Sequence, residues 1–214
     1  MSRIAIKICG LSTPETLDAA LKGGASHVGF VHFAKSPRHV DGDRLAQLAA
    51  RVPGHVRKVG VVVNPDNAEI EMLVRVGDLD ALQLHGSEAP ERLAQIRARF
   101  PRLHLWKAVP VKTAADIAGS AAYREVADLI LFDAKTPDHA DLPGGMGLRF
   151  DWSLLSGYRS HSPWGLSGGL DPDNVAEAIR ISGTQLVDVS SGVESAPGIK
   201  DVDKLAAFCK AARS

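Results

Sequence analysis

Short apolar runs alternate with longer amphipathic stretches from one end of the chain to the other. The runs are rich in Val, Ile, Leu and Ala and are bounded by Gly, Pro, Asn, Asp or Ser, which is typical of buried β-strands. Eight strands are predicted, at Ile4–Cys9, His27–Phe33, Arg57–Val63, Ala81–His85, Leu103–Ala108, Leu129–Ala134, Pro163–Ser167 and Gln185–Ser190.

The stretches between these strands carry helix start and stop signals. Thr13–Glu15 places a cap residue and a proline at the start of one helix, and Gly23–Gly24 predicts its end. Further starts are predicted at Asn64–Asp66, Ser87–Glu88 and Asp171–Asp173, and a last helix from about Asp201 to Ala212.

Strands that alternate with helices imply parallel pairing with right-handed crossovers. Eight such units in 214 residues favour a single domain, residues 1–214, folded as a closed (β/α)8 barrel. The alternative is an open doubly wound sheet, which normally has a glycine-rich phosphate turn after its first strand. Only Cys9–Leu11 stands at that place, so the barrel is preferred.

The sixth unit is irregular. After Asp133 the chain has a run rich in Gly and Pro, residues 137–147, before a short helix expected at Asp151–Leu155. Long loops at the carboxyl end of a barrel strand are usually functional, so this loop is expected to border a site.

Composition narrows the function classes. The 25 basic and 25 acidic residues balance, and no basic run occurs, so neither nucleic acid nor an anionic membrane is an expected partner. No apolar run is long enough to span a bilayer, and no signal peptide is expected before the first strand. Two cysteines are too few for a disulfide framework or a zinc cluster, so we expect no metal and a cytoplasmic location.

The first strand separates an apolar face from a polar one. Ile4, Ile6 and Ile8 share one face, whereas Lys7 and Cys9 share the other, with the thiol at the mouth of the barrel. An ionised thiol there can act as a base or nucleophile, although a free cysteine is often only a small buried hydrophobe.

The closing strands of the predicted barrel bring Lys7 beside Asp188. Both side chains are expected inside the barrel, so we expect an ion pair between them. Lys7 either lowers the pKa of Cys9 as well or only balances Asp188.

The loops after the last two strands predict a phosphate site. Gly168 and Gly169 follow strand seven, while Ser190 ends strand eight and Ser191 and Gly192 follow it. Glycines admit a ligand close to the backbone, and phosphate sites in this fold recur at these two places. Ordinary strand-to-helix turns also favour Gly and Ser, which is the alternative interpretation.

Three further polar side chains are expected at the same mouth. Asp133 ends an apolar strand and faces a partly desolvated cavity, which suits it to donate a proton; a helix cap or a salt bridge to Lys135 is the alternative. Arg38 could clamp a carboxylate or phosphate, or could simply be a solvated charge. His85 could contact substrate or only fill the rim. A general base opposite a general acid predicts proton transfers within one substrate, that is, an isomerisation.

These residues lie in a series of motifs: Lys7–Gly10, Gly29–Val31, Lys35–Arg38, Gln83–Gly86, Phe132–Lys135, Gly144–Gly147, Phe150–Trp152, Ser167–Leu170 and Val187–Glu194. With these motifs the chain resembles the phosphoribosylanthranilate isomerase family nearly end to end. Their order and spacing make the resemblance specific.

The resemblance implies an Amadori rearrangement of N-(5′-phosphoribosyl)anthranilate in tryptophan biosynthesis, without a cofactor. Cys9 matches the family's general base, Asp133 its general acid, and Arg38 the residue that contacts the anthranilate end. His32 departs from the apolar or aromatic residue usual at its position, and strand alternation places it with the packing rather than the chemistry. Monomers and homodimers both occur on this fold, so either state is expected.

Three rival functions remain. The histidine-pathway isomerase uses aspartates as acid and base, so Cys9 argues against it. Indoleglycerol-phosphate synthase relies on an N-terminal extension and a lysine acid. A binding-only phosphosugar module would not need both Cys9 and Asp133.

Overall fold

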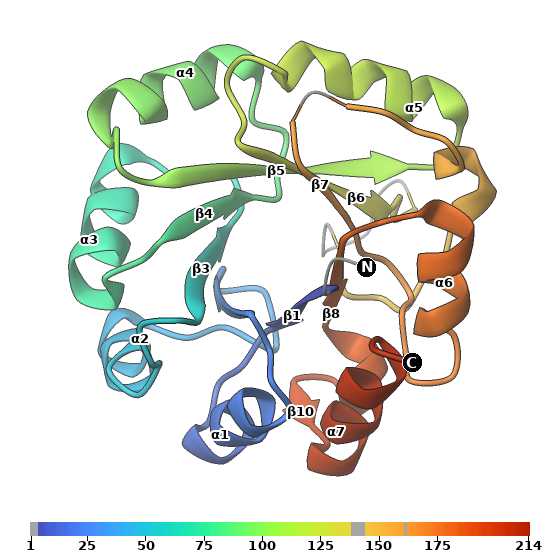
Figure 1. Ribbon diagram of the computed structural model, residues 1–214. Helices are drawn as coiled ribbons and strands as arrows, with labels where there is room; N and C mark the ends of the chain where they lie inside the picture. Colours follow the sequence, from blue (N-terminus) through green and yellow to red (C-terminus); the bar gives the residue numbers. More distant parts are fainter. Residues whose placement is uncertain (1–3, 138–143, 161) are drawn as a thin grey trace.

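The strands form a closed barrel with the helices on its outside. A computed structural model describes residues 4–137, 144–160 and 162–214. Eight parallel strands within these residues pair in chain order, and the eighth pairs with the first (Figure 1). They are β1 (Ala5–Cys9), β2 (His27–His32), β3 (Arg57–Val62), β4 (Ala81–Leu84), β5 (His104–Val111), β6 (Leu129–Ala134), β7 (Trp164–Leu166) and β8 (Leu186–Val189).

The helices form a ring around these strands (Figure 1). The α-helices are α1 (Pro14–Lys22), α2 (Gly42–Ala49), α3 (Asn67–Gly77), α4 (Pro90–Arg99), α5 (Ala114–Gly119), α6 (Val175–Ser182) and α7 (Val202–Ala211). Single 3₁₀ turns are η1 (Ser120–Tyr123), η2 (Trp152–Leu155) and η3 (Ser191–Val193). The short helix expected near Asp151 is therefore a 3₁₀ turn, η2, with Asp151 as its N-cap.

Pairing between the first and last strands settles the choice between the two architectures. Ala5 pairs with Leu186 and Lys7 with Asp188, so the sheet has no free edge there. The closed (β/α)8 barrel predicted from the alternation is confirmed, and the open doubly wound sheet is excluded.

Local chemistry explains where several helices begin. The side chains of Thr13, Asp66 and Asp201 each accept a hydrogen bond from a backbone N–H of the first turn of α1, α3 and α7. Such caps contribute about 1 kcal/mol each. Two other starts differ from the prediction: α4 begins only at Pro90, and α6 only at Val175.

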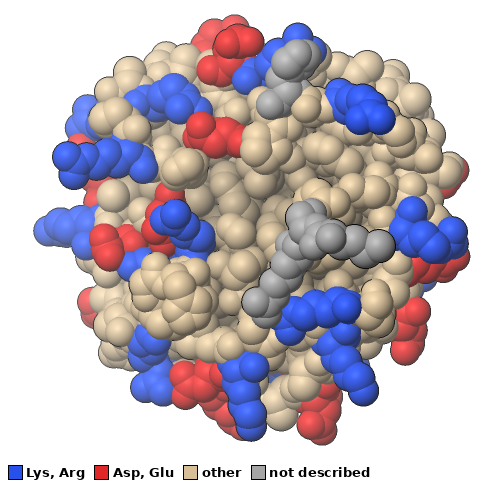
Figure 2. Space-filling model, viewed as in Figure 1, with Lys and Arg blue, Asp and Glu red and all other residues tan. Residues whose placement is uncertain are grey.

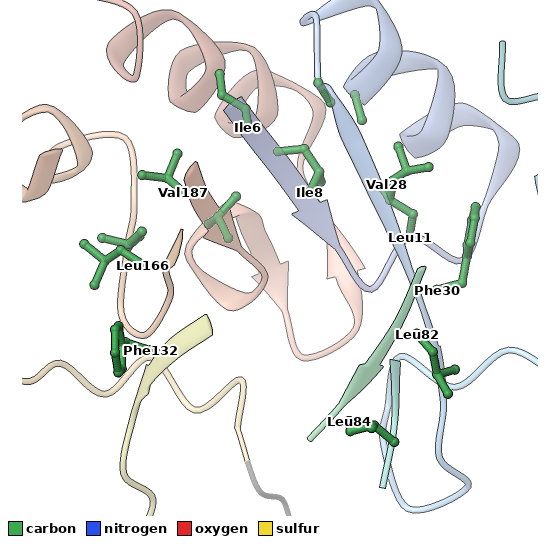
Figure 3. Packing of buried hydrophobic residues seen from close by; sticks show 14 of the residues in the cluster. Ile6, Ile8, Leu11, Val28, Phe30, Leu82, Leu84, Phe132, Leu166 and Val187 are labelled. Carbon is green, nitrogen blue, oxygen red and sulfur yellow. The ribbon is translucent and has the colours of Figure 1, made fainter. Parts of the chain in front are cut away.

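Two apolar layers hold the barrel together. Ile6 and Ile8 project from one side of β1 toward the surrounding helices, as do Val28 and Phe30 from β2 (Figure 3). Each such fully buried side chain stabilises the fold by roughly 1.5–3 kcal/mol. A smaller layer fills the barrel interior and consists of Val59, Ala81, Trp106, Leu131 and Leu186.

The inner layer forms a floor beneath the carboxyl ends of the strands. Two residues nearer the carboxyl ends of their strands, Gln83, Asp133 and Asp188 follow Ala81, Leu131 and Leu186 on the same face. Lys7 of β1 lies at the same level, because it pairs with Asp188. The interior thus changes from apolar to polar toward the end of the barrel where active sites of this fold are found.

Two elements extend beyond the expected pattern. Strand β5 continues past the predicted end at Ala108 to Val111. After η3, a two-stranded hairpin of β9 (Glu194–Ala196) and β10 (Ile199–Lys200) precedes α7. This hairpin is absent from the predicted set of strands, and it turns out to support the site.

Charge is evenly spread on the surface that can be viewed. In Figure 2 basic and acidic side chains are interspersed around the edge of the face. Among the described residues, no helix has the length and apolar character needed to cross a bilayer.

Candidate active site

A pocket opens at the carboxyl ends of the barrel strands, with a volume of about 820 Å³ including its open mouth. Apolar side chains form part of its wall, among them Val31 of β2, Phe33 directly after β2, and Val61 of β3. The residues predicted for the site that line this pocket are Cys9, Arg38, His85, Asp133, Gly168, Gly169, Ser190 and Ser191. Eight side chains or turns from six strands therefore converge on one space.

Gly192 is the predicted site residue that does not line the pocket. Its Cα lies against the backbone of Leu170, so that a Cβ would come within 1.9 Å of the Leu170 carbonyl oxygen. Only glycine fits there, which explains the residue type by close packing between the loops after β7 and β8.

Cys9 ends β1 with its side chain in the pocket wall and only 6% of its surface exposed. Burial raises the pKa of the thiol above its ordinary value of 9.0, and the nearby positive charge of Lys7 opposes this only partly. The thiol is thus the resting form, and a positive charge beside it assists its ionisation.

Lys7 and Asp188 form the ion pair that strand alternation predicts. Lys7 Nζ donates to Asp188 Oδ1 at 2.9 Å, and the ammonium group is fully buried. Burial lowers the pKa of Lys7, but the charges of Asp188 and Cys9 and the hydrogen bonds to them together outweigh this and hold the pKa above its ordinary value. Lys7 acts on both neighbours: it balances Asp188 and also lowers the pKa of Cys9.

Asp133 lies within β6, and its carboxylate points into the pocket. Its Oδ1 accepts the backbone N–H of Ala134 at 2.9 Å, and its Oδ2 lies 3.1 Å from Nε2 of His85. Its hydrogen-bonding side-chain partner is therefore His85 rather than Lys135, and it caps none of the described helices. The oxygen Oδ2 is the one placed to carry a transferable proton.

A short hydrogen-bonded chain links Asp133 to the interior of the barrel. Gln83 Nε2 lies 3.0 Å from Nδ1 of His85, while Oε1 of Gln83 is buried and has no hydrogen-bond partner among the described residues. Rotation of the amide by 180° would present Oε1 to His85 instead, and the two orientations select opposite tautomers of the imidazole. His85 is thus held between an amide and a carboxyl group.

Arg38 is buried at the rim, with 6% of its side chain exposed, so it is not a solvated charge. Its Nε and one terminal nitrogen donate to the two carboxylate oxygens of Glu194 at 2.7 and 2.8 Å. The same terminal nitrogen also donates to the carbonyl of Gly145 at 3.1 Å. The guanidinium is fixed in one orientation by this forked contact.

Glu194 and Lys200 are polar residues of this region that the sequence pattern did not single out. Glu194 ends a motif and Lys200 lies just before the last helix, and nothing in their spacing shows that they meet. Lys200 Nζ donates to Glu194 Oε1 at 2.7 Å, and both are buried.

The loops after β7 and β8 present backbone to the pocket. Gly168 and Gly169 have φ values of +88° and +62°, which favour glycine, and a Cβ on Gly168 would lie 2.5 Å from the Ala134 nitrogen. Ser190 donates its hydroxyl to the carbonyl of Cys9 at 3.2 Å, which ties the second loop to β1. Backbone N–H groups of such loops suit an anionic ligand.

His32 lies on the outer face of β2, as alternation predicts. Its Nδ1 lies 2.8 Å from the carbonyl of Val40, and its neighbours Val31 and Phe33 line the pocket instead. Cys209 lies in α7 and is buried in the apolar core. Among the described residues, no cluster of three or more His, Cys, Asp or Glu is arranged to hold a metal ion.

Comparison with known proteins identifies the same family along nearly the whole chain. A family model described as N-(5'phosphoribosyl)anthranilate (PRA) isomerase matches residues 6–211. A relative named N-(5'-phosphoribosyl)anthranilate isomerase from Zymomonas mobilis subsp. pomaceae is 55% identical over 207 residues, covering 97% of each chain. One of the same name from Paramagnetospirillum magneticum is 52% identical, covering 98% of this chain and 97% of its own.

Solved structures agree in fold. Phosphoribosyl anthranilate isomerase from Thermotoga maritima superposes with a TM-score of 0.87 at 38% identity over 98% of both chains. A structure of that enzyme family in complex with reduced 1-(o-carboxyphenylamino)-1-deoxyribulose 5-phosphate has a TM-score of 0.84 at 36% identity, again over 98% of both chains. The chain belongs to the N-(5'-phosphoribosyl)anthranilate isomerase family.

Proposed function

We propose that this chain converts N-(5′-phosphoribosyl)anthranilate to 1-(2-carboxyphenylamino)-1-deoxyribulose 5-phosphate, with Asp133 as general acid and Cys9 as general base. The observation that carries the proposal is that these two groups, from β6 and β1, line one pocket whose remaining wall offers a guanidinium and glycine turns. The family to which the chain belongs supports the choice of substrate.

Ring opening is the acid-catalysed step. Asp133 gives its proton to the ribose ring oxygen while the amine nitrogen donates its lone pair to C1′, and the bond between C1′ and the ring oxygen breaks. The product is an open-chain Schiff base, protonated on nitrogen, and an Asp133 carboxylate. That carboxylate is stabilised by the Ala134 N–H and by His85 in its Nε2–H tautomer.

Proton removal from C2′ is the base-catalysed step. Cys9 as thiolate takes this proton, and the electrons of the C–H bond form an enolamine as the iminium charge is neutralised. The enolamine becomes the ketone by gaining a proton at C1′ and losing one from the 2′-hydroxyl. The steps move protons within one substrate, so they need no external oxidant or reductant.

Each turnover leaves Asp133 without the proton that it gave to the ring oxygen and leaves Cys9 with the proton taken from C2′, so both groups must be reset before the next cycle. Lys7 favours loss of the proton from the thiol, whereas His85, whose side chain is 17% exposed, connects Asp133 with the solvent-filled mouth. The form of the enzyme that can begin a turnover is therefore the one in which Asp133 is protonated and Cys9 is ionised.

Binding involves the two ends of the substrate. The phosphate lies at the backbone of the loops after β7 and β8, near Gly168 and Ser191, and the anthranilate carboxylate lies at Arg38. We propose a small phosphorylated molecule as the only partner besides a second copy of the chain, and a cytoplasmic location. A relative from Thermotoga maritima is described as dimeric, and monomer and homodimer are both compatible with the fold.

The test is turnover of freshly generated N-(5′-phosphoribosyl)anthranilate, followed by the loss of anthranilate-type fluorescence. Rapid loss with the parent and a large reduction with Cys9→Ser or Asp133→Ala support the proposal. A folded parent that does not turn over this substrate contradicts it. Binding of the product analogue by both parent and Asp133→Ala, with no turnover by either, would instead indicate a binding-only module.

A further inference from the structure

We propose that Glu194 and Lys200 are positioning residues that aim Arg38 at the pocket, and that this arrangement sets the preference for an aryl amine that carries a carboxylate. The inference rests on the proposed function, because it concerns the anthranilate end of the same substrate. It assigns a role to the β9–β10 hairpin, which supplies both residues.

The first step of the argument is the number of contacts that fix Arg38. Glu194 occupies Nε and one terminal nitrogen of the guanidinium through both carboxylate oxygens, which sets the plane of the group. The second terminal nitrogen, NH1, makes no hydrogen bond to a described residue. A Cβ on Gly145 would lie 2.7 Å from it, and Gly145 and Arg38 both line the pocket. Because Arg38 lines the pocket and its other two nitrogens are bonded to Glu194 and Gly145, NH1 is the guanidinium nitrogen that, among the described residues, remains for a ligand.

The second step is that Glu194 is itself held from behind. Its Oε1 accepts from Lys200 Nζ at 2.7 Å and its Oε2 from the backbone N–H of Gly198 at 3.2 Å. Lys200 Nζ also donates to the carbonyl of Ser190 at 2.9 Å. Because Ser190 hydrogen-bonds the Cys9 carbonyl, the chain of contacts ties the orientation of Arg38 to the strand that carries the base.

The third step is steric. The stem of Arg38 packs directly against Gly10, since a Cβ on Gly10 would come within 2.6 Å of Arg38 Cδ. The hairpin turn at Gly198 has φ +82°, and a Cβ there would come within 2.5 Å of the Pro37 carbonyl oxygen. The hairpin is thus packed directly on the loop that bears Arg38, and a displacement of one moves the other.

The fourth step is charge. Arg38 and Lys200 contribute two positive charges to this buried cluster, and Glu194 contributes one negative charge, so one positive charge is in excess. Burial and the charge of Arg38 lower the pKa of Lys200, although Glu194 opposes them. Burial raises the pKa of Glu194, but its bonds to Arg38 and Lys200 prevail and hold it below its ordinary value. An anion in the pocket completes the cluster, and a carboxylate matches the free guanidinium edge.

The experiment compares two substrates in each variant. One is N-(5′-phosphoribosyl)anthranilate, and the other is the corresponding aniline compound, which lacks the carboxylate. In Glu194→Gln we expect the ratio of kcat/KM for the anthranilate compound to kcat/KM for the aniline compound to fall by about tenfold. The change should come mainly from KM, because the guanidinium loses its paired hydrogen bonds to a charged carboxylate. Turnover of the aniline compound should change less than about threefold, since the acid and base are untouched.

A double-mutant cycle separates positioning from general loss of structure. Arg38→Met should lower the ratio at least as far as Glu194→Gln, and the double variant should be no worse than Arg38→Met alone. Ser195→Ala, an exposed change in the same hairpin, is the matched control and should leave the ratio at the parent value.

Glu194→Gln leaves two buried positive charges, so it carries a risk of unfolding. Combining it with Lys200→Met restores the parent net charge of the cluster, and this variant serves if the single one does not fold. Equal losses on both substrates, or additive losses in the cycle, would overturn the inference while leaving the proposed function in place. A folded parent inactive on both substrates would instead remove the proposed function.

Discussion

His85 Nε2 lies 3.1 Å from Asp133 Oδ2, so the acid of the proposed reaction is paired with an imidazole rather than with a lysine or arginine. A permanent cation at that place would hold Asp133 ionised and oppose its use as an acid. An imidazole can donate to the carboxylate or accept from the carboxylic acid, depending on its tautomer. The pair therefore suits a group that must lose and regain a proton in every cycle.

Asp133→Asn should reduce kcat/KM by about 10²- to 10⁴-fold, because the amide cannot protonate the ring oxygen. Fluorescence-detected turnover measures the loss, and unchanged binding of a product analogue shows that the pocket is intact. His85→Asn should cost less than Asp133→Asn, since His85 acts through Asp133. A larger loss for His85→Asn would assign the acid role to the histidine.

The raised pKa of Cys9 predicts the pH at which the thiol ionises. Burial raises this pKa above 9.0, so alkylation of Cys9 should be slow at neutral pH. The rate of alkylation should reach half of its maximum only at a pH above 9.0. Because Asp133 must be protonated while Cys9 is ionised, kcat/KM should fall as the pH rises above the thiol pKa, where neither group keeps its proton.

Alkylation followed by mass spectrometry in a Cys209→Ala background isolates Cys9, because Cys209 is the other free thiol. In Lys7→Met the pKa of Cys9 should shift further upward, since Lys7 lowers it in the parent. A Cys9 that titrates identically in Lys7→Met would show that Lys7 serves only Asp188.

Removal of one partner of the Lys7–Asp188 pair should destabilise the barrel strongly. Lys7→Met leaves the buried Asp188 carboxylate without its cation, and such a loss costs about 3–5 kcal/mol. Urea unfolding measures the free energy. The double variant Lys7→Met/Asp188→Leu should recover most of the loss, because no buried charge remains; equal stability of the single and double variants would contradict this account.

His27 should make the fold sensitive to acid. Burial first, and then the charges of Lys7 and Arg57, lower its pKa to about 4, although Asp80 opposes them. Between pH 6.5 and pH 4 the imidazole of the unfolded chain is largely protonated, whereas that of the native protein is largely neutral. Acid therefore favours the unfolded chain, so the contribution of His27 to the free energy of unfolding is fully present above pH 6.5 and is lost as the pH falls toward 4. The contribution is about 3 kcal/mol.

The comparison with His27→Gln isolates this effect from the carboxylates that also titrate. Urea unfolding of both proteins at pH 7 and pH 4 gives the difference. The parent should lose about 3 kcal/mol more than the variant on acidification. Parallel losses in the two proteins would show that His27 is neutral in both states or charged in both.

Much of the barrel could be predicted because strand periodicity is a local signal. The strand from Leu129 to Ala134 was predicted at its observed bounds, and the others differ mainly at their ends. The inward direction of Lys7, Cys9 and Asp133 also follows from alternation alone.

What could not be predicted depends on partners distant in sequence. In the sequence Glu88 fits the pattern of a residue at the start of a helix. In the structure it is buried, and its carboxylate accepts hydrogen bonds from Lys107 and from the backbone N–H groups of Asn64 and Gly86. In the same way, Arg38 has the composition of a surface loop residue until Glu194 meets it, 156 positions later. A single sequence contains no local trace of such pairings.

The closure of the sheet has a consequence for synthesis on the ribosome. Lys7 emerges in the first strand, but its counter-ion Asp188 lies 181 residues downstream, in the last strand of the barrel. Until that strand leaves the exit tunnel, burial of the lysine would leave its charge unpaired, and the barrel cannot close. The nascent chain is therefore expected to acquire its native interior late and in one concerted event, rather than unit by unit as the chain grows.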